Sequence, residues 1–171
     1  VSSSLMKKGS PQDTIPHFNG TQTYRVNLLG IIPAGKLVIN PEKTDERYPG
    51  FFILTAAAET LPWLQSFYPA KASLYSRIQS QTLAPVEFTQ TISLHGKKES
   101  VKKILYDQDQ GIMTLEGQQR TIPPQTQDPL SLLNNLRNMN LSSTKSFEYT
   151  INTNQKNYLF SAIVKPASIS V

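Results

Sequence analysis

The clearest periodic pattern in the chain is helical and covers residues 128–141. Apolar residues recur there at spacings of three and four, which places them on one side of a helix. The stripe consists of Leu130, Leu132, Leu133, Leu136 and Met139. Asp128 is a favourable N-cap, and Pro129 suits the first helical position because the N–H that it lacks would be unpaired there anyway. We therefore expect a helix whose apolar side packs against a sheet.

Most of the remaining chain alternates apolar and polar residues, which is typical of half-buried strands. The expected strands are 22–29, 36–40, 51–55, 70–80, 86–95, 100–106, 112–116, 146–152 and 157–164. A bend is expected at 30–35, where glycines flank a proline, and a short helix or pair of turns at 59–68. The short connections predict a mainly β fold: a curved antiparallel sheet or half-open β-barrel with one or two short helices packed on it.

The 171 residues fit a single domain. Residues 1–20 are rich in Ser, Gly, Pro and Lys and predict a flexible N-terminal tail, whereas residues 21–171 predict one β domain. No run of about 18 apolar residues is present, so no transmembrane segment is expected in this chain. The chain begins at Val1 rather than Met, which fits a processed protein from which a signal peptide or lipid anchor was removed.

The chain is basic, with a net charge of +5 and a pI of about 9.4. Solubility at neutral pH explains this charge, and attraction to phospholipid, lipopolysaccharide or a polyanionic glycan is the alternative. Nucleic acid is disfavoured because the basic residues are scattered. Four lysines crowd one expected hairpin, either as a solvated edge or as a contact to an anionic surface. They are Lys97, Lys98, Lys102 and Lys103.

The sequence offers little catalytic chemistry. The absence of cysteine excludes disulfides, thiolate zinc sites and cysteine nucleophiles. His17 and His95 stand alone, and residues 107–111 resemble a calcium loop only in part, since the twelfth position is Gln118. Strand or turn positions explain the carboxylates that hydrolysis of a glycan would use, which are Glu59, Glu87, Asp107 and Glu116. With no Gly-x-Ser-x-Gly turn and no phosphate-binding loop, we expect a non-catalytic domain without metal or cofactor.

Several short motifs follow one another in a specific order. They are Gly30, Ile31, Ala34 and Gly35; Trp63, Leu64, Phe67, Tyr68 and Pro69; Leu83, Pro85 and Phe88; Tyr106 and Asp107; and Gln127 to Leu130 with Leu133, Leu136 and Arg137. Through these motifs, residues 23–164 resemble the bacterial cell-envelope family called domain of unknown function three-one-zero-eight. The resemblance implies a secreted or periplasmic protein, often lipid-anchored, with no assigned activity. It also implies a fold similar to the lipoprotein carrier proteins, whose half-open barrel holds acyl chains in an apolar cavity. Family members often continue with further strands, so this domain is expected either to be trimmed at its C-terminus or to lack those strands.

Two apolar groups are candidates for a ligand site. The first is Trp63, Leu64 and Phe67 in the expected short helix, and the second is Leu133 and Leu136 in the longer one. Either these side chains fill the core, or the two helices roof a cavity inside the curved sheet. We expect a domain of the periplasm or outer cell envelope that binds a lipid, lipoprotein or other apolar ligand. The alternatives are an adaptor that binds another envelope protein through the strand edge at 146–164 and, third, a glycan-active enzyme.

Overall fold

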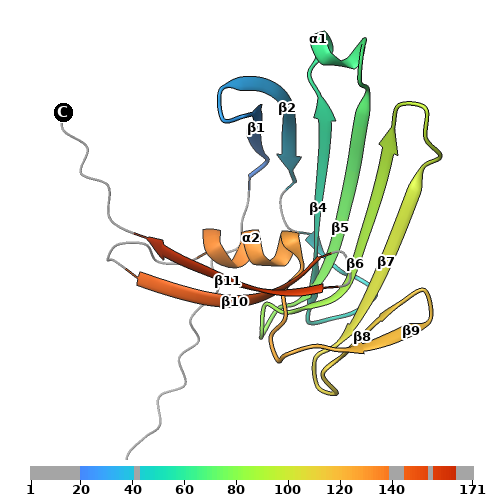
Figure 1. Cartoon of the computed structure of the whole chain (residues 1–171). Coiled ribbons are helices and arrows are strands. Elements are labelled where there is room, and N and C mark those ends of the chain that lie inside the picture. The colour runs from blue at the N-terminus through green and yellow to red at the C-terminus, as the bar shows by residue number, and fades with distance from the viewer. Residues whose placement is uncertain (1–19, 41–42, 139–144, 154–155, 165–171) are drawn as a thin grey trace, which may run out of the picture.

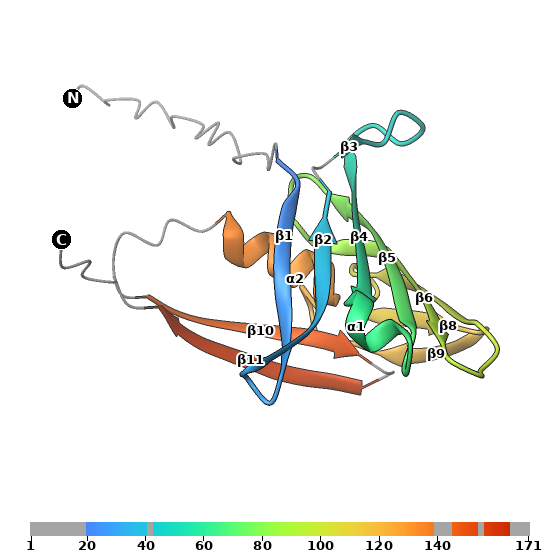
Figure 2. The ribbon, with the colours of Figure 1, turned by 90° about the horizontal axis from the view of Figure 1, so that it is seen from above.

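Nine strands form one antiparallel sheet in the computed structural model, which describes residues 20–40, 43–138, 145–153 and 156–164 (Figure 1). They are β1 (Gln22–Leu28), β2 (Ile32–Ile39), β3 (Lys43–Thr44), β4 (Phe51–Thr60), β5 (Ala70–Gln79), β6 (Pro85–Leu94), β7 (Ser100–Asp107), β8 (Ile112–Leu115) and β9 (Gln118–Thr121). The order across the sheet is β1-β2-β4-β5-β6-β7-β8-β9, and β3 pairs with β4. Within the described residues the sheet is curved and open rather than closed into a barrel (Figure 2). The prediction of a mainly β fold with a curved antiparallel sheet is confirmed.

The helix α2 (Pro129–Arg137) packs on one face of this sheet, which we call the inner face; the opposite side is the outer face. It contacts β4 and β5 on one side and β10 on the other. A separate hairpin consists of β10 (Lys145–Thr153) and β11 (Lys156–Val164). Gln127 N donates to Thr150 O at 2.7 Å, and Asn152 N donates to Gln127 O at 2.7 Å, so the hairpin is attached to the segment before the helix. The helix therefore lies between the large sheet and the hairpin (Figures 1 and 2).

The predicted start of the helix is confirmed. The Asp128 carboxylate accepts hydrogen bonds from Leu130 N (2.7 Å) and Ser131 N (2.9 Å), while Asp128 N donates to Ser131 Oγ (2.9 Å). This reciprocal pair is a capping box, and it satisfies donors that would otherwise be buried without a partner. The helix ends at Arg137 with Asn138 as its C-cap, and residues 139–141 lie outside the described residues.

The core lies between the inner face and α2. Its largest contributors come from alternate positions of β4 to β8, as the period of a half-buried strand requires. The buried apolar side chains include Ile39, Phe52, Leu54, Ile78, Phe88, Ile104, Tyr106, Met113, Leu115 and Leu130. Leu133 is partly buried and packs against this cluster. The core is therefore concentrated where α2 covers the sheet.

The strand predictions were wrong at 30–35 and missed two strands, β3 and β9. The bend expected at 30–35 is shorter, because β2 already begins at Ile32 and includes Pro33 and Gly35. A shift in the β1–β2 register between Val26 and Asn27 lets the ladder continue past the proline, which can donate no hydrogen bond. The strand β9 was not predicted, because its four residues are polar and exposed and show no alternation.

The short helix α1 (Pro62–Gln65) confirms the expectation at 59–68. Thr60, whose hydroxyl would suit a cap for this helix, instead ends β4, and its Oγ1 accepts from Ala70 N at 3.2 Å. The N-cap position is Leu61, which has no side-chain acceptor. The helix therefore begins without a cap and depends on Pro62 and its neighbours for its start.

Candidate functional site

An apolar hollow of about 230 Å³ lies on the inner face beyond the end that α2 covers. We call it the inner trough, and we define it by Val26, Ala58, Ala70, Ala72, Ile92 and Leu94. These residues come from four strands, and Ala34, Gly35, Lys36, Glu59, Thr60 and Lys71 complete the lining. In the described residues, the inner trough is a part of the inner face where apolar side chains lack a covering helix.

The register of the strands explains why the inner trough is hollow. Ala58 pairs with Ala72, and Ala72 pairs with Ile92, so two alanines stand side by side on one face. Two rows along the same face, Leu54 and Phe88 are fully buried under α2. Alanine is too short to fill the space that leucine and phenylalanine fill, so the sheet keeps an open apolar groove at this end.

A second hollow of about 210 Å³ continues the inner trough towards α2. Leu74 and Gln90 line it, and they are the next inward-facing positions after Ala72 and Ile92. Its other lining residues are Phe88, Lys102, Ile104, Leu115, Pro129, Asn152 and Thr153. The inner face therefore offers a path that is apolar at the open end and meets polar groups near the helix.

Asp128 is fully buried beside this path and joins α2 to the sheet. Ser76 Oγ donates to its Oδ2 at 2.6 Å, in addition to the two backbone donors of the cap. Burial raises the pKa of Asp128 to about 6, although its hydrogen bonds from Ser76 and the backbone favour the charged form. Burial also raises the pKa of Tyr106, helped by the charge of Asp128. These groups hold the helix in place, and none of them lines either hollow.

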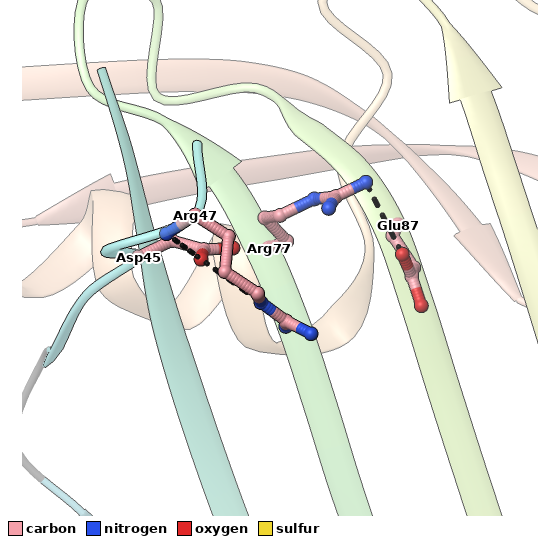
Figure 3. A network of polar contacts seen from close by, with 4 residues as sticks. All are labelled: Asp45, Arg47, Arg77 and Glu87. Carbon is pink, nitrogen blue, oxygen red and sulfur yellow. Dashed lines mark hydrogen bonds and ion pairs between the residues drawn. The ribbon is translucent and has the colours of Figure 1, made fainter. Parts of the chain in front are cut away.

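A polar network on the outer face holds the loop after β3 against β5 and β6 (Figure 3). Arg77 Nη2 lies 3.2 Å from Glu87 Oε2, and the Arg77 guanidinium lies 4.5 Å from the centre of the Tyr48 ring. Arg47 contacts Asp45 through both its backbone N (3.1 Å) and its Nε (3.6 Å). The network therefore packs the loop on the sheet.

Three of the four carboxylates considered for hydrolysis, Glu59, Glu87 and Asp107, have local partners. Glu87 also contacts Lys103 Nζ at 2.8 Å, and Glu59 contacts Lys36 Nζ at 2.9 Å. The hydrogen bond and charge of Lys36 lower the pKa of Glu59. Asp107 accepts from Gln110 N at 2.8 Å in a hairpin turn. These contacts stabilise strands and turns, and within the described residues no group of three or more His, Asp or Glu could hold a metal ion.

The outer face carries a larger hollow of about 580 Å³. Its lining is mixed, with Lys36, Glu59, Lys71, Ser73, Thr91, Ser93 and Glu99 beside three alanines and Val38. Lys36, Glu59 and Lys71 pair side by side at positions that alternate with the inward-facing residues, so their charged groups lie on the outer face and resist burial there by an apolar ligand. The inner trough, although smaller, is therefore the better candidate for an apolar ligand.

The structure does not bring the two predicted apolar groups together. Trp63 and Phe67 lie at α1, at the end of the sheet opposite α2, and are 51% and 78% exposed (Figure 1). Leu64 is half-buried there. Leu133 and Leu136 are half-buried on α2, where Leu133 packs on the core. A cavity roofed jointly by both helices is therefore not formed.

The four predicted lysines also separate. Lys97 and Lys98 are exposed at the connection between β6 and β7. Lys102 lines the second inner hollow, whereas Lys103 contacts Glu87 on the outer face. Successive residues of a strand point to opposite faces, so Lys102 and Lys103 cannot share a surface.

The sequence analysis missed the residues of the inner trough. Ala58, Ala70 and Ala72 were a usable signal, because small side chains at alternate positions of two paired strands leave a hollow. These alanines indicate a hollow only when the register of β4 and β5 is known, and the sequence alone does not determine that register.

The architecture defines a class: a mainly β domain in which an open, curved antiparallel sheet partly encloses one helix. Residues 23–166 match the family described as "Protein of unknown function (DUF3108)", and the chain belongs to this family. The family predicted from the short motifs is thereby confirmed. No curated protein and no solved structure matches the chain. Among the described residues, no helix has the length and apolar character needed to cross a membrane.

Proposed function

We propose that this protein is a non-catalytic domain of the bacterial cell envelope that binds the acyl chain of a lipid or lipoprotein in the inner trough. The observation that carries the proposal is the uncovered apolar lining of Val26, Ala58, Ala70, Ala72, Ile92 and Leu94. The family has no assigned function. The envelope location rests on the resemblance described above.

The shape of the inner face fits an extended chain better than a compact ligand. The inner trough and the second hollow follow one another along β5 and β6, through Ala72 and Leu74 on one strand and Ile92 and Gln90 on the next. An acyl chain lying there would bury its own methylenes and the half-buried alanines together. Each buried methylene contributes about 0.8 kcal/mol, so even part of a chain gives measurable affinity.

A substitution that fills the inner trough tests this proposal. Ala72→Phe places a large side chain between Ala58 and Ile92, and we expect at least about a tenfold loss of affinity for a fluorescent fatty-acid probe. Ser73→Phe is the matched control, because it places the same side chain on the outer face at the next position of β5. Native mass spectrometry of the protein from a gentle membrane extract, before and after organic extraction, identifies the bound mass.

The two variants also separate the two faces. Loss of probe binding in Ser73→Phe with full binding in Ala72→Phe would move the site to the outer hollow. Absence of probe binding and of any lipid mass in the unsubstituted protein would overturn the proposal. Circular dichroism of both variants verifies that the sheet is intact.

The envelope location has its own test. Fractionation of cells that express the full-length protein should recover it with the periplasm or the membranes. Recovery in the cytosolic fraction would contradict this part of the proposal and leave acyl-chain binding to be judged separately.

A second candidate function is an adaptor that binds another envelope protein through β11. In the described chain β11 pairs with β10 alone, so its other edge faces outward, and Leu159 and Ile163 are each 69% exposed. An unpaired edge can accept a strand from a partner. Leu159→Ser with Ile163→Ser should remove the partner from a pull-down of envelope extract, whereas the same change at Leu29 and Ile31 should not. Retention of the partner by the β11 variant would contradict the adaptor function.

A further inference from the structure

Three connections meet at the end of the sheet away from α2 (Figure 1). They are the β1–β2 turn, α1 with the residues that lead to β5, and the β6–β7 turn. Leu61 N donates to Ala34 O at 2.8 Å, and Trp63 Nε1 donates to Pro33 O at 2.9 Å. His95 N donates to Pro69 O at 3.0 Å. These bonds tie the first residues of β2 and the β6–β7 turn to the connection that contains α1. We call the surface formed by residues 29–31, 61–69 and 95–99 the tip.

The tip exposes large apolar side chains. Leu29 is 84% exposed, Ile31 82% and Phe67 78%, while Trp63 is half-exposed with its ring N–H already hydrogen-bonded. A cluster of this kind on one end of a domain marks an interaction surface rather than the scattered exposure that all proteins show. Leu29 also has a φ of +52°, where a leucine is strained and glycine would not be. The chain therefore keeps a large apolar side chain at a position that favours glycine.

The charges beside these side chains are mostly positive. Lys97 and Lys98 are exposed at the β6–β7 turn, and Lys71 is the second residue of β5, at the end of the strand that begins at the tip. Glu59 and Glu99 are the acidic residues in the same region, and Glu59 is paired with Lys36. The surface around the apolar side chains therefore carries excess positive charge.

We propose that the tip docks on the surface of an anionic phospholipid bilayer, with Leu29, Ile31, Trp63 and Phe67 at headgroup depth. This inference goes beyond the binding of an acyl chain and does not require it. Exposed aliphatic side chains, a tryptophan and flanking lysines are the combination that favours the interface between headgroups and acyl chains. Three protruding connections can enter a deformable bilayer together, whereas a protein partner would need a matching hollow for each. The inner trough contains Val26 and Leu94, which belong to strands that end at the tip, so a docked tip places the trough beside the bilayer.

Trp63 provides a direct readout because it is the only tryptophan in the chain. Vesicles of phosphatidylcholine and phosphatidylglycerol in equal parts should shift its fluorescence to the blue, and lipids brominated near the headgroup should quench it. Vesicles of phosphatidylcholine alone should bind at least about tenfold more weakly, because lysines near an anionic surface each contribute attraction. An unchanged Trp63 spectrum with both kinds of vesicle would overturn the proposal.

Matched variants locate the docking surface. Leu29→Ser with Ile31→Ser should weaken vesicle binding by about tenfold or more, since two apolar side chains no longer leave water. Leu159→Ser with Ile163→Ser is the control, because it removes the same residue types from the exposed β11. Lys97→Gln with Lys98→Gln should weaken binding to the anionic vesicles alone. If the β11 variant loses binding and the β1–β2 variant keeps it, the tip is not the docking surface.

The experiment keeps docking separate from ligand binding. Ala72→Phe fills the inner trough and leaves the tip unchanged, so it should still dock on vesicles. Docking without acyl-chain binding would support this inference and contradict the proposed function. Acyl-chain binding without docking would contradict this inference and support the proposed function.

Discussion

Asp128 is the residue on which the helix and the sheet converge. Its side chain receives hydrogen bonds from two backbone N–H groups of α2 and from Ser76 of β5, and it is fully buried. Two effects oppose each other at this carboxyl. The hydrogen bonds favour the charged form and burial favours the neutral form, and burial dominates because the pKa is raised to about 6.

The raised pKa makes the stability of the fold depend on pH in a defined direction. Since the folded state holds the Asp128 proton more tightly than the unfolded state, this group stabilises the fold most at acid pH and loses that contribution as the pH rises to about 6. Asp128→Asn cannot titrate but can still accept from the helix backbone. We therefore expect the free energy of unfolding of the unsubstituted protein, relative to Asp128→Asn, to fall by up to about 3 kcal/mol between pH 4 and pH 7. Urea unfolding of both proteins at the two pH values measures this difference.

Glu59→Gln is the control of opposite sign. Lys36 lowers the pKa of Glu59, so the contribution of Glu59 is present at neutral pH and is lost as the pH falls. If the free energies of unfolding of the unsubstituted protein and Asp128→Asn differ by the same amount at pH 4 and pH 7, burial does not raise the pKa of Asp128.

At the scale of elements, the pairing of β2 with β4 is unusually close at Gly35. A Cβ atom at this position would lie 2.8 Å from the backbone oxygen of Glu59. Because that contact is with backbone, the two strands would have to separate locally. Gly35→Ala should therefore lower the free energy of unfolding by about 1–3 kcal/mol, measured by urea unfolding.

Gly20→Ala is the matched control for this substitution. No atom lies within 4 Å of a Cβ built on Gly20, so we expect its stability to stay within about 0.5 kcal/mol of the original. A stability of Gly35→Ala equal to that of Gly20→Ala would contradict the close approach of β2 and β4.

The elements that were predictable from sequence are those with a local cause. Asp128, Pro129 and the leucine stripe determine where α2 starts, the apolar run at 51–55 identifies β4, and alternation identifies β6. The start of β2 was not predictable, because a register shift opposite Pro33 depends on the partner strand. The polar β9 has no pattern of its own and is a strand because β8 offers it a partner.

The inner trough belongs to the scale of the whole molecule. Ala58, Ala72 and Ile92 are separated along the chain and become neighbours only through the register of β4, β5 and β6. No local sequence pattern predicts that α2 covers one end of the inner face and leaves the other end open. The same holds for α1, which lies far from α2 because the long strands β4 and β5 carry it to the tip (Figure 1).

The position of α2 in the chain has a consequence for biosynthesis. All nine strands of the large sheet precede the helix, so a nascent chain can pair them before the helix has left the ribosome. During that interval the apolar side chains of the inner face are uncovered, which is the condition in which sheets aggregate or recruit chaperones. When α2 and the β10–β11 hairpin emerge, they cover one end of that face. The inner trough is then a part of the inner face that stays uncovered in the folded protein as it was in the nascent chain.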